Sequence, residues 1–183
     1  RGLVTHRQRR QQTGGTVIQT NAAIGTFTIG GRNAGSTNAV GVYNLSGGNL
    51  IAIAPVRMSG YGSATFNQSG GIFTSASGSG GINLQRFAGP GGTYNLNGGV
   101  ANLNNIDASV LNTDPTFHSI FNFNGGTLKP TATRANFMPA KLSRANIRNG
   151  GAVIDTAGFN VSIEQILSHS DIGGDNATDG GVT

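Results

Sequence analysis

The sequence contains no cysteine and no tryptophan, and only 10% of its 183 residues are charged. Without cysteine the chain can form neither a disulfide framework nor a thiolate metal site. No apolar run approaches the roughly 20 residues of a membrane-spanning helix, and no apolar signal-peptide region follows the basic start. We therefore expect no membrane span. Because the chain begins with Arg1 rather than Met, we expect a processed product or a fragment.

Glycine, in contrast, is abundant, with 31 residues. A flexible linker would have a similar glycine content, but it would not place Val, Ile, Leu, Phe and Tyr at regular positions between the glycines. The composition therefore indicates an ordered, turn-rich chain that is long enough for a hydrophobic core.

One ten-residue phrase recurs along the chain. It reads "VYNLSGGNLI" at residues 42–51, "TFNQSGGIFT" at 65–74, "TYNLNGGVA" at 93–101, "FNFNGGTLKP" at 121–130 and, more loosely, "ANIRNGGAVI" at 145–154. The second glycines of these phrases, separated by 23, 28, 27 and 25 residues, are Gly48, Gly71, Gly99, Gly126 and Gly151. Repeats of 20 to 50 residues are typical of solenoids and arrays.

Each repeat reads as a strand, a corner and a second strand. Tyr94 and Leu96 alternate with polar neighbours, which is the period of a half-buried strand. The glycine pair then permits a positive φ and a sharp corner. The sequence therefore predicts an all-β parallel β-helix (β-solenoid) of roughly seven coils. The apolar residues expected in its strands are Tyr94, Leu96, Phe121, Phe123, Val153, Ile154, Phe159, Val161 and Ile163.

Stacked coils bring equivalent side chains into register about 4.8 Å apart. Matching asparagines could therefore form a ladder of side-chain amides, and the aromatic residues beside them a stack. The alternative is that asparagine only tolerates the turn and the aromatics are ordinary strand residues. The predicted ladder and stack comprise Asn44, Asn67, Asn95, Asn122, Tyr43, Phe66, Tyr94 and Phe121.

Other segments depart from the repeat. Residues 104–119 and 134–147 alternate more weakly, and we expect them to be short excursions with a helical turn each, limited by Pro115 and Pro139. The start, "RGLVTHRQRR", matches no repeat. We therefore predict a basic N-terminal arm over residues 1–12 and a β-helix domain over residues 13–183.

Three phrases, "TYNLNGG", "FNFNGGTLKPTATRANFM" and "IRNGGAVIDTAGFNVSIEQIL", carry a family resemblance. In them the chain resembles the autotransporter-associated β-strand repeat proteins, which are large bacterial surface proteins frequent in planctomycetes and verrucomicrobia. The resemblance covers residues 42–183 and is strongest over 121–166. It implies a right-handed winding, an extracellular or cell-surface location, and adhesive or structural roles without catalytic residues. Such proteins usually continue through many more repeats.

Catalysis by the fold would need positioned acids and bases, since some β-helices cleave acidic polysaccharides. Asp107, Asp114 and His118 share one excursion, but polar residues in a loop are usually only solvated. Four sequons, at Asn44, Asn67, Asn160 and Asn176, are weak signals in a chain so rich in Asn and Ser. We therefore expect that the chain is not an enzyme and that it has no catalytic residue and no cofactor. Glycans are candidate partners, either attached covalently or bound as ligands.

Charge is divided unevenly along the chain. Residues 1–150 contain all 12 Lys and Arg with 2 acids, for a net charge of +10, and residues 151–183 contain 5 acids and no Lys or Arg. The arginines at the start of the chain could also bind nucleic acid, but we consider this interpretation weaker because no aromatic residues are interleaved with them. The acids Asp171, Asp175 and Asp179 offer calcium ligands, but their spacing matches neither the EF-hand nor the nonapeptide repeat, so no metal is expected.

These observations favour a structural subunit of an extracellular fibre or surface layer, in which solenoids assemble head to tail. The final "NATDGGVT" shows no cap, and uncapped coils expose unpaired backbone groups. The alternative is a fragment of a large adhesin that binds glycans or a host surface. The expected subunit interface pairs the basic start with the acidic end, through Arg1, Arg7, Arg9, Arg10, Asp171, Asp175 and Asp179.

Overall fold

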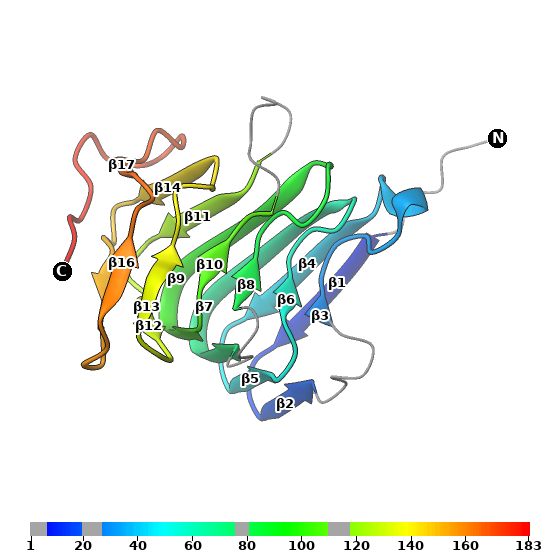
Figure 1. Ribbon diagram of the computed structural model, residues 1–183, viewed down its shortest axis with the longest axis horizontal. Coiled ribbons are helices and arrows are strands. Elements are labelled where there is room, and N and C mark those ends of the chain that lie inside the picture. Colours follow the sequence, from blue (N-terminus) through cyan, green and yellow to red (C-terminus); the bar gives the residue numbers. More distant parts are fainter. Residues whose placement is uncertain (1–6, 20–26, 76–80, 110–117) are drawn as a thin grey trace.

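The computed structural model describes residues 7–19, 27–75, 81–109 and 118–183. It is a parallel β-solenoid, in which each coil runs through up to three short strands and stacks on the preceding coil (Figure 1). The coils follow one another in sequence order, so β1 lies near one end of the long axis and β17 near the other. The predicted all-β solenoid is therefore confirmed.

The first face is a ladder of seven parallel strands in the order β1-β4-β7-β9-β11-β14-β17. Equivalent residues of the sequence repeat are partners in it, as Asn44, Asn67 and Asn95 illustrate. The strands are β1 (Arg7–Gln12), β4 (Val40–Leu45), β7 (Ser63–Ser75), β9 (Gly91–Leu103), β11 (Ile120–Phe123), β14 (Arg144–Ile147) and β17 (Leu167–His169).

The second face follows the glycine corner. The long strands β7 and β9 bend through this corner and continue on the second face. The strand order there is β2-β5-β7-β9-β12-β15, with β2 at Thr16–Gln19, β5 at Asn49–Ala52, β12 at Thr127–Pro130 and β15 at Val153–Ile154.

The third face has shorter strands. It consists of β3 (Phe27–Thr28), β6 (Val56–Arg57), β8 (Ile82–Asn83) and β10 (Ile106–Asp107), with β13 (Arg134–Met138) pairing separately with β16 (Val161–Ile163). Within the described ranges the helical structure is limited to one 3-10 turn, Ala34–Ser36.

The core lies inside the coils because the strands alternate buried and exposed residues. Tyr94, Leu96, Phe121 and Phe123 are fully buried, as predicted. Four further predicted residues do lie in strands but are only half-buried, namely Val153, Ile154, Val161 and Ile163. Phe159 was predicted wrongly: it precedes β16 and is 38% exposed.

The corner glycines meet two requirements. Gly48, Gly71, Gly99 and Gly151 have φ between 67° and 75°, a region that L side chains rarely adopt. A Cβ atom on Gly99 would also lie only 2.3 Å from the carbonyl oxygen of Gly71 in the preceding coil. In the fourth phrase the positive φ belongs to Gly125 and not to Gly126, so the expected position shifts by one residue there.

Several boundary predictions were wrong. Residues 7–12 are not part of an arm, because they form β1 and pair in parallel with β4 along its whole length. Residues 134–147 contain no helical turn, since β13 and β14 occupy this segment. Residues 104–109 contain β10, and the rest of the first excursion, including Pro115, lies outside the described residues up to residue 117.

The estimate of roughly seven coils is slightly high. Seven strands line the first face, but β17 is not followed by strands on both of the other faces. The right-handed winding stays an expectation from the family resemblance.

Candidate functional site

The predicted asparagine ladder is present in the structure. Each Nδ2 donates to the Oδ1 of the preceding coil: Asn67 to Asn44 at 2.8 Å, Asn95 to Asn67 at 2.7 Å and Asn122 to Asn95 at 2.6 Å. The ladder continues to a residue that the sequence analysis did not include, because Asn146 donates to Asn122 at 2.7 Å. The amides therefore link five successive coils.

The predicted aromatic stack lies beside the ladder, inside the core. Ring centroids are 5.3 Å apart between Tyr43 and Phe66, 4.8 Å between Phe66 and Tyr94, and 4.9 Å between Tyr94 and Phe121. The rings are tilted or edge-on by 57° to 61°, an arrangement that the aromatic quadrupole favours over a face-to-face stack. Consecutive coils are therefore connected through both side chains of the "Tyr/Phe-Asn" pair.

The two tyrosines of this stack have buried partners. The Tyr43 hydroxyl donates to Gln12 Oε1 at 2.7 Å, and the Tyr94 hydroxyl donates to Gln68 Oε1 at 2.5 Å. Each glutamine belongs to the coil before its tyrosine, and the Gln68 amide also donates to Val100 O at 3.0 Å in the tyrosine's own coil. Burial raises the pKa of Tyr94 well above its usual value, which keeps this hydroxyl protonated as a donor.

The other coils have an apolar version of this contact. Leu45 and Leu96 occupy the glutamine position, and the aromatic residues in the coils that follow them are Phe66 and Phe121. A coil with glutamine is thus followed by tyrosine, and a coil with leucine is followed by phenylalanine. The match leaves no buried hydroxyl opposite a leucine in these four pairs.

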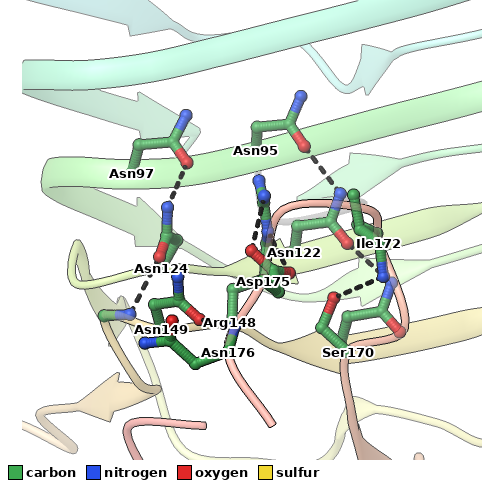
Figure 2. A network of polar contacts seen from close by, with 12 residues as sticks. Asn95, Asn97, Asn122, Asn124, Arg148, Asn149, Ser170, Ile172, Asp175 and Asn176 are labelled. Carbon is green, nitrogen blue, oxygen red and sulfur yellow. Dashed lines mark hydrogen bonds and ion pairs between the residues drawn. The ribbon is translucent and has the colours of Figure 1, made fainter.

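A second column of polar contacts runs along the outer corner, where Asn124 donates to Asn97 Oδ1 at 3.0 Å (Figure 2). In the coils that follow, Asn124 Oδ1 accepts from Gly150 N at 2.9 Å and Asn149 Oδ1 accepts from Asn176 N at 2.8 Å. This column satisfies backbone donors at the turns.

The residues of the predicted subunit interface lie at opposite ends of the solenoid. Arg7, Arg9 and Arg10 are exposed on β1, and Arg1 lies outside the described residues. Asp171, Asp175 and Asp179 follow β17. β1 lies near one end of the solenoid and β17 near the other (Figure 1). The contact between the two groups in neighbouring copies stays a prediction.

The acidic residues already have partners within the chain. Asp175 accepts from Nε and a terminal nitrogen of Arg148, both at 2.8 Å, and its side chain is only 5% exposed. The hydrogen bonds from Arg148 and from Ser170 lower the Asp175 pKa to about 2. Asp171 pairs with Arg144 at 2.7 Å and Asp179 with His169 at 3.0 Å.

The other candidates from the sequence do not form a site. Asp107 pairs with Lys141 at 3.3 Å, His118 is exposed, and Asp114 lies outside the described residues. Over the described ranges no three His, Asp or Glu residues gather as metal ligands would. No helix in that part of the chain is long and apolar enough to cross a membrane.

The structure places a groove on the third face that the sequence analysis missed. It measures about 260 Å³, and we call it the β6–β8 groove. Its polar lining residues come from three strands and the loops beside them, namely Arg57, Asn83, Arg86, Asn105, Asp107 and Ser109. The pairing of β6, β8 and β10 sets Arg57, Asn83 and Asp107 side by side on the outer surface, because Val56, Ile82 and Ile106 point into the core.

Positive charge is concentrated at this groove. Partial burial, followed by the nearby charges of Arg86 and Arg32, lowers the Arg57 pKa, although the guanidinium stays charged at neutral pH. Arg57 belongs to none of the five ion pairs that the described residues form. Arg86 donates to Ser109 Oγ at 2.8 Å, and so does Asn83 Nδ2.

Sequence reasoning missed the groove because its strands have two residues each, too few to show a period. Its arginines stand 29 residues apart, and only the stacking of coils brings them together.

Comparison with known proteins gave no match among protein families, curated proteins or solved structures.

Proposed function

We propose that this chain is a structural subunit of an extracellular bacterial fibre or surface layer, built from β-solenoids that stack end to end. The observation that carries the proposal is the continuous ladder of Asn44, Asn67, Asn95, Asn122 and Asn146. Each coil contacts the next through side-chain amides, aromatic rings and backbone hydrogen bonds, all in the same register. The extracellular, bacterial setting follows from the resemblance to autotransporter-associated β-strand repeat proteins.

The first coil offers a surface that another coil fits. Among the described residues β1 pairs only with β4. Gln12 O accepts from Ser46 N, which directly follows β4, so the backbone groups of Gln12 face β4. Because alternate residues of a parallel strand face opposite neighbours, the backbone groups of Arg7, Arg9 and Gln11 face the unpaired edge. Gln11 occupies the ladder position, opposite Asn44. Val17 and Ile18 on β2 are 44% and 55% exposed.

We assign this edge to the far end of a second copy. A head-to-tail contact between copies propagates as a filament unless its rotation closes a ring. Backbone pairing and apolar stacking supply the affinity, because Asp171, Asp175 and Asp179 are already paired with Arg144, Arg148 and His169. Ion pairs with Arg7, Arg9 and Arg10 would require those carboxylates to give up their present partners. The arginines therefore contribute more to the orientation of approaching copies than to the affinity between them.

The test compares two variants of the intact chain, Arg9→Pro and Arg9→Gln, by light scattering and negative-stain microscopy. Proline removes the N–H group that faces the unpaired edge, whereas glutamine removes only the charge. We expect filaments from the wild type and from Arg9→Gln, and none from Arg9→Pro. Filaments of normal length from Arg9→Pro would show that β1 does not form the contact between copies. A monodisperse wild-type monomer at high concentration would show that the chain does not assemble into filaments.

A second candidate function, an adhesin fragment that binds glycans, is favoured by the β6–β8 groove. This open, polar hollow with two arginines lies on the lateral surface, away from both ends of the solenoid. Lateral binding and end-to-end stacking use different surfaces, so one molecule can do both.

A further inference from the structure

The β6–β8 groove holds a positive charge that the chain does not neutralise. Arg57 is half-buried, it lies close enough to Arg86 and Arg32 for their charges to lower its pKa, and it forms no ion pair with any described residue. Holding like charges together at a partly buried site costs stability unless an anion neutralises them. A guanidinium beside an open hollow is the geometry that binds a planar carboxylate through two parallel hydrogen bonds.

The remaining lining favours a polyhydroxylated molecule over a uniform polyanion. Asp107 contributes a carboxylate to the same hollow, which accepts hydrogen bonds from hydroxyl groups but repels closely spaced phosphates. Lys141 holds this carboxylate in place at 3.3 Å. The juxtaposition of Arg57 and Asp107, two coils apart on the same face, therefore presents an anion-binding group and a hydroxyl-binding group to one ligand.

An aromatic pair lies next to the groove. The rings of Tyr61 and Phe87 stack at 4.7 Å with an interplanar angle of 15°, and the Arg86 guanidinium lies 5.5 Å from the Phe87 centroid. This contact and the hydrogen bond to Ser109 fix the Arg86 side chain at the rim. The hollow of about 260 Å³ is smaller than a typical drug-sized pocket of roughly 300–1,000 Å³, which suits one or two sugar units of a longer chain that passes along the solenoid.

We propose that the β6–β8 groove binds an acidic saccharide, with Arg57 holding the sugar carboxylate, Asp107 accepting from a sugar hydroxyl and Arg86 contributing a second positive charge at the rim. This binding site goes beyond the structural role proposed above and does not depend on filament formation.

The test is titration calorimetry of the intact chain with oligogalacturonate, and with a neutral galactose oligomer of equal length. We expect binding of the acidic oligomer only. Arg57→Gln should weaken it about tenfold or more, the range expected when one charge-assisted hydrogen-bonded contact is lost, and Arg57→Lys should restore part of the affinity. Lys129→Gln, which removes a positive charge on the second face, is the control and should bind like the wild type.

Three outcomes would overturn the proposal. They are equal binding of the neutral oligomer, an unchanged affinity of Arg57→Gln, and tighter binding of single-stranded DNA or inorganic sulfate than of the oligogalacturonate. The last result would make the groove a general anion site. Since Arg57 points outward from β6 and lies beside like charges, the melting temperature of Arg57→Gln should be no lower than that of the wild type. A loss of affinity then reports a lost contact and not a loss of folding.

Discussion

A buried glutamine stabilises this solenoid only when the next coil provides a hydroxyl for it. Gln68 and Tyr94 are both fully buried, and the hydroxyl of Tyr94 donates to Gln68 Oε1 at 2.5 Å. Removing one member leaves the other with an unsatisfied polar atom in the core, whereas removing both leaves an apolar contact of similar shape. The chain itself contains that apolar version, in Leu96 and Phe121.

We predict that Tyr94→Phe and Gln68→Leu each lower the free energy of unfolding by about 1–3 kcal/mol, and that the double variant loses much less than their sum. Chemical denaturation of the four proteins of this cycle measures the coupling.

The reciprocal exchange at the next boundary is the control. Phe121→Tyr alone places a hydroxyl opposite Leu96 and should destabilise, and the addition of Leu96→Gln should recover part of the loss. Additive effects in both cycles would show that the hydroxyl and amide do not act as a pair.

At the scale of the elements, the corner between the first and second faces depends on glycine for two separate reasons. Gly99 combines a φ of 71° with backbone from the preceding coil only 2.3 Å from where a Cβ atom would lie. Gly158, in the later turn between β15 and β16, has a φ of 82°, but nothing lies within 4 Å of the position that a Cβ atom would take. The first glycine is limited by conformation and by space, and the second by conformation alone.

We predict that Gly158→Ala lowers the free energy of unfolding by about 1–2 kcal/mol, the cost of the left-handed conformation. Gly99→Ala should lose a further 1–3 kcal/mol, about the cost of overpacking, because the neighbouring coil must move. Thermal and urea unfolding of both variants measures the difference. Equal losses would mean that the coils separate at the corner without cost.

The parts of the fold that could be predicted from the sequence are those in which the sequence pattern repeats. Alternation and the glycine pair were enough to predict the first two faces and the register of Asn44, Asn67, Asn95 and Asn122. The predicted arm was wrong over residues 7–12, and its residues 1–6 lie outside the described residues. The six residues of β1 are polar and five of them are exposed, so the strand shows no apolar alternation. Phe159 was misplaced because hydrophobicity alone does not distinguish a strand residue from one in the turn before it.

The candidate sites were harder to predict for a different reason. The Gln68–Tyr94 contact joins residues 26 apart, and the Gln12–Tyr43 contact joins residues 31 apart, so no fixed spacing reveals the pairing. The β6–β8 groove likewise depends on loop lengths that set which residues of successive coils become neighbours.

For the whole molecule, the division of charge along the sequence does not give a free acidic end. Lys129 pairs with Asp155 at 2.7 Å, Arg144 with Asp171 at 2.7 Å and Arg148 with Asp175 at 2.8 Å. In each pair the acid lies one coil after the base, so these three acids of residues 151–183 neutralise three bases from the end of residues 1–150. Among the described residues, Arg7, Arg9 and Arg10 on β1 and Arg57 and Arg86 at the β6–β8 groove belong to none of the ion pairs.

These ion pairs predict an acid-sensitive end. The folded-state pKa of Asp175 is about 2, lowered first by its hydrogen bond with Arg148, and the pKa values of Asp155 and Asp171 are also lowered by their basic partners. Between the unfolded-state pKa near 3.9 and the folded-state value, the unfolded chain binds more protons. The stabilisation from these pairs is therefore complete above about pH 4. That from Asp175 is lost as the pH falls toward about 2, and that from Asp155 and Asp171 is lost as the pH falls through their lowered pKa values.

We expect the melting temperature followed by circular dichroism to fall between pH 5 and pH 2.5, and to fall less in Asp175→Asn. Glu164→Gln is the matched control, since Glu164 belongs to no ion pair of the described residues, and it should keep the full decrease. An identical decrease in Asp175→Asn would assign the acid sensitivity to other groups.

The matching of glutamine to tyrosine and of leucine to phenylalanine gives the solenoid a rule of coil order. Its middle coils are of two kinds, one with Tyr and Leu (Tyr43 with Leu45, Tyr94 with Leu96) and one with Phe and Gln (Phe66 with Gln68). Either kind fits on the other, but two alike in succession would bury an unpaired hydroxyl or amide. Over these coils the two kinds alternate, so such coils can be lost or duplicated without penalty only in pairs.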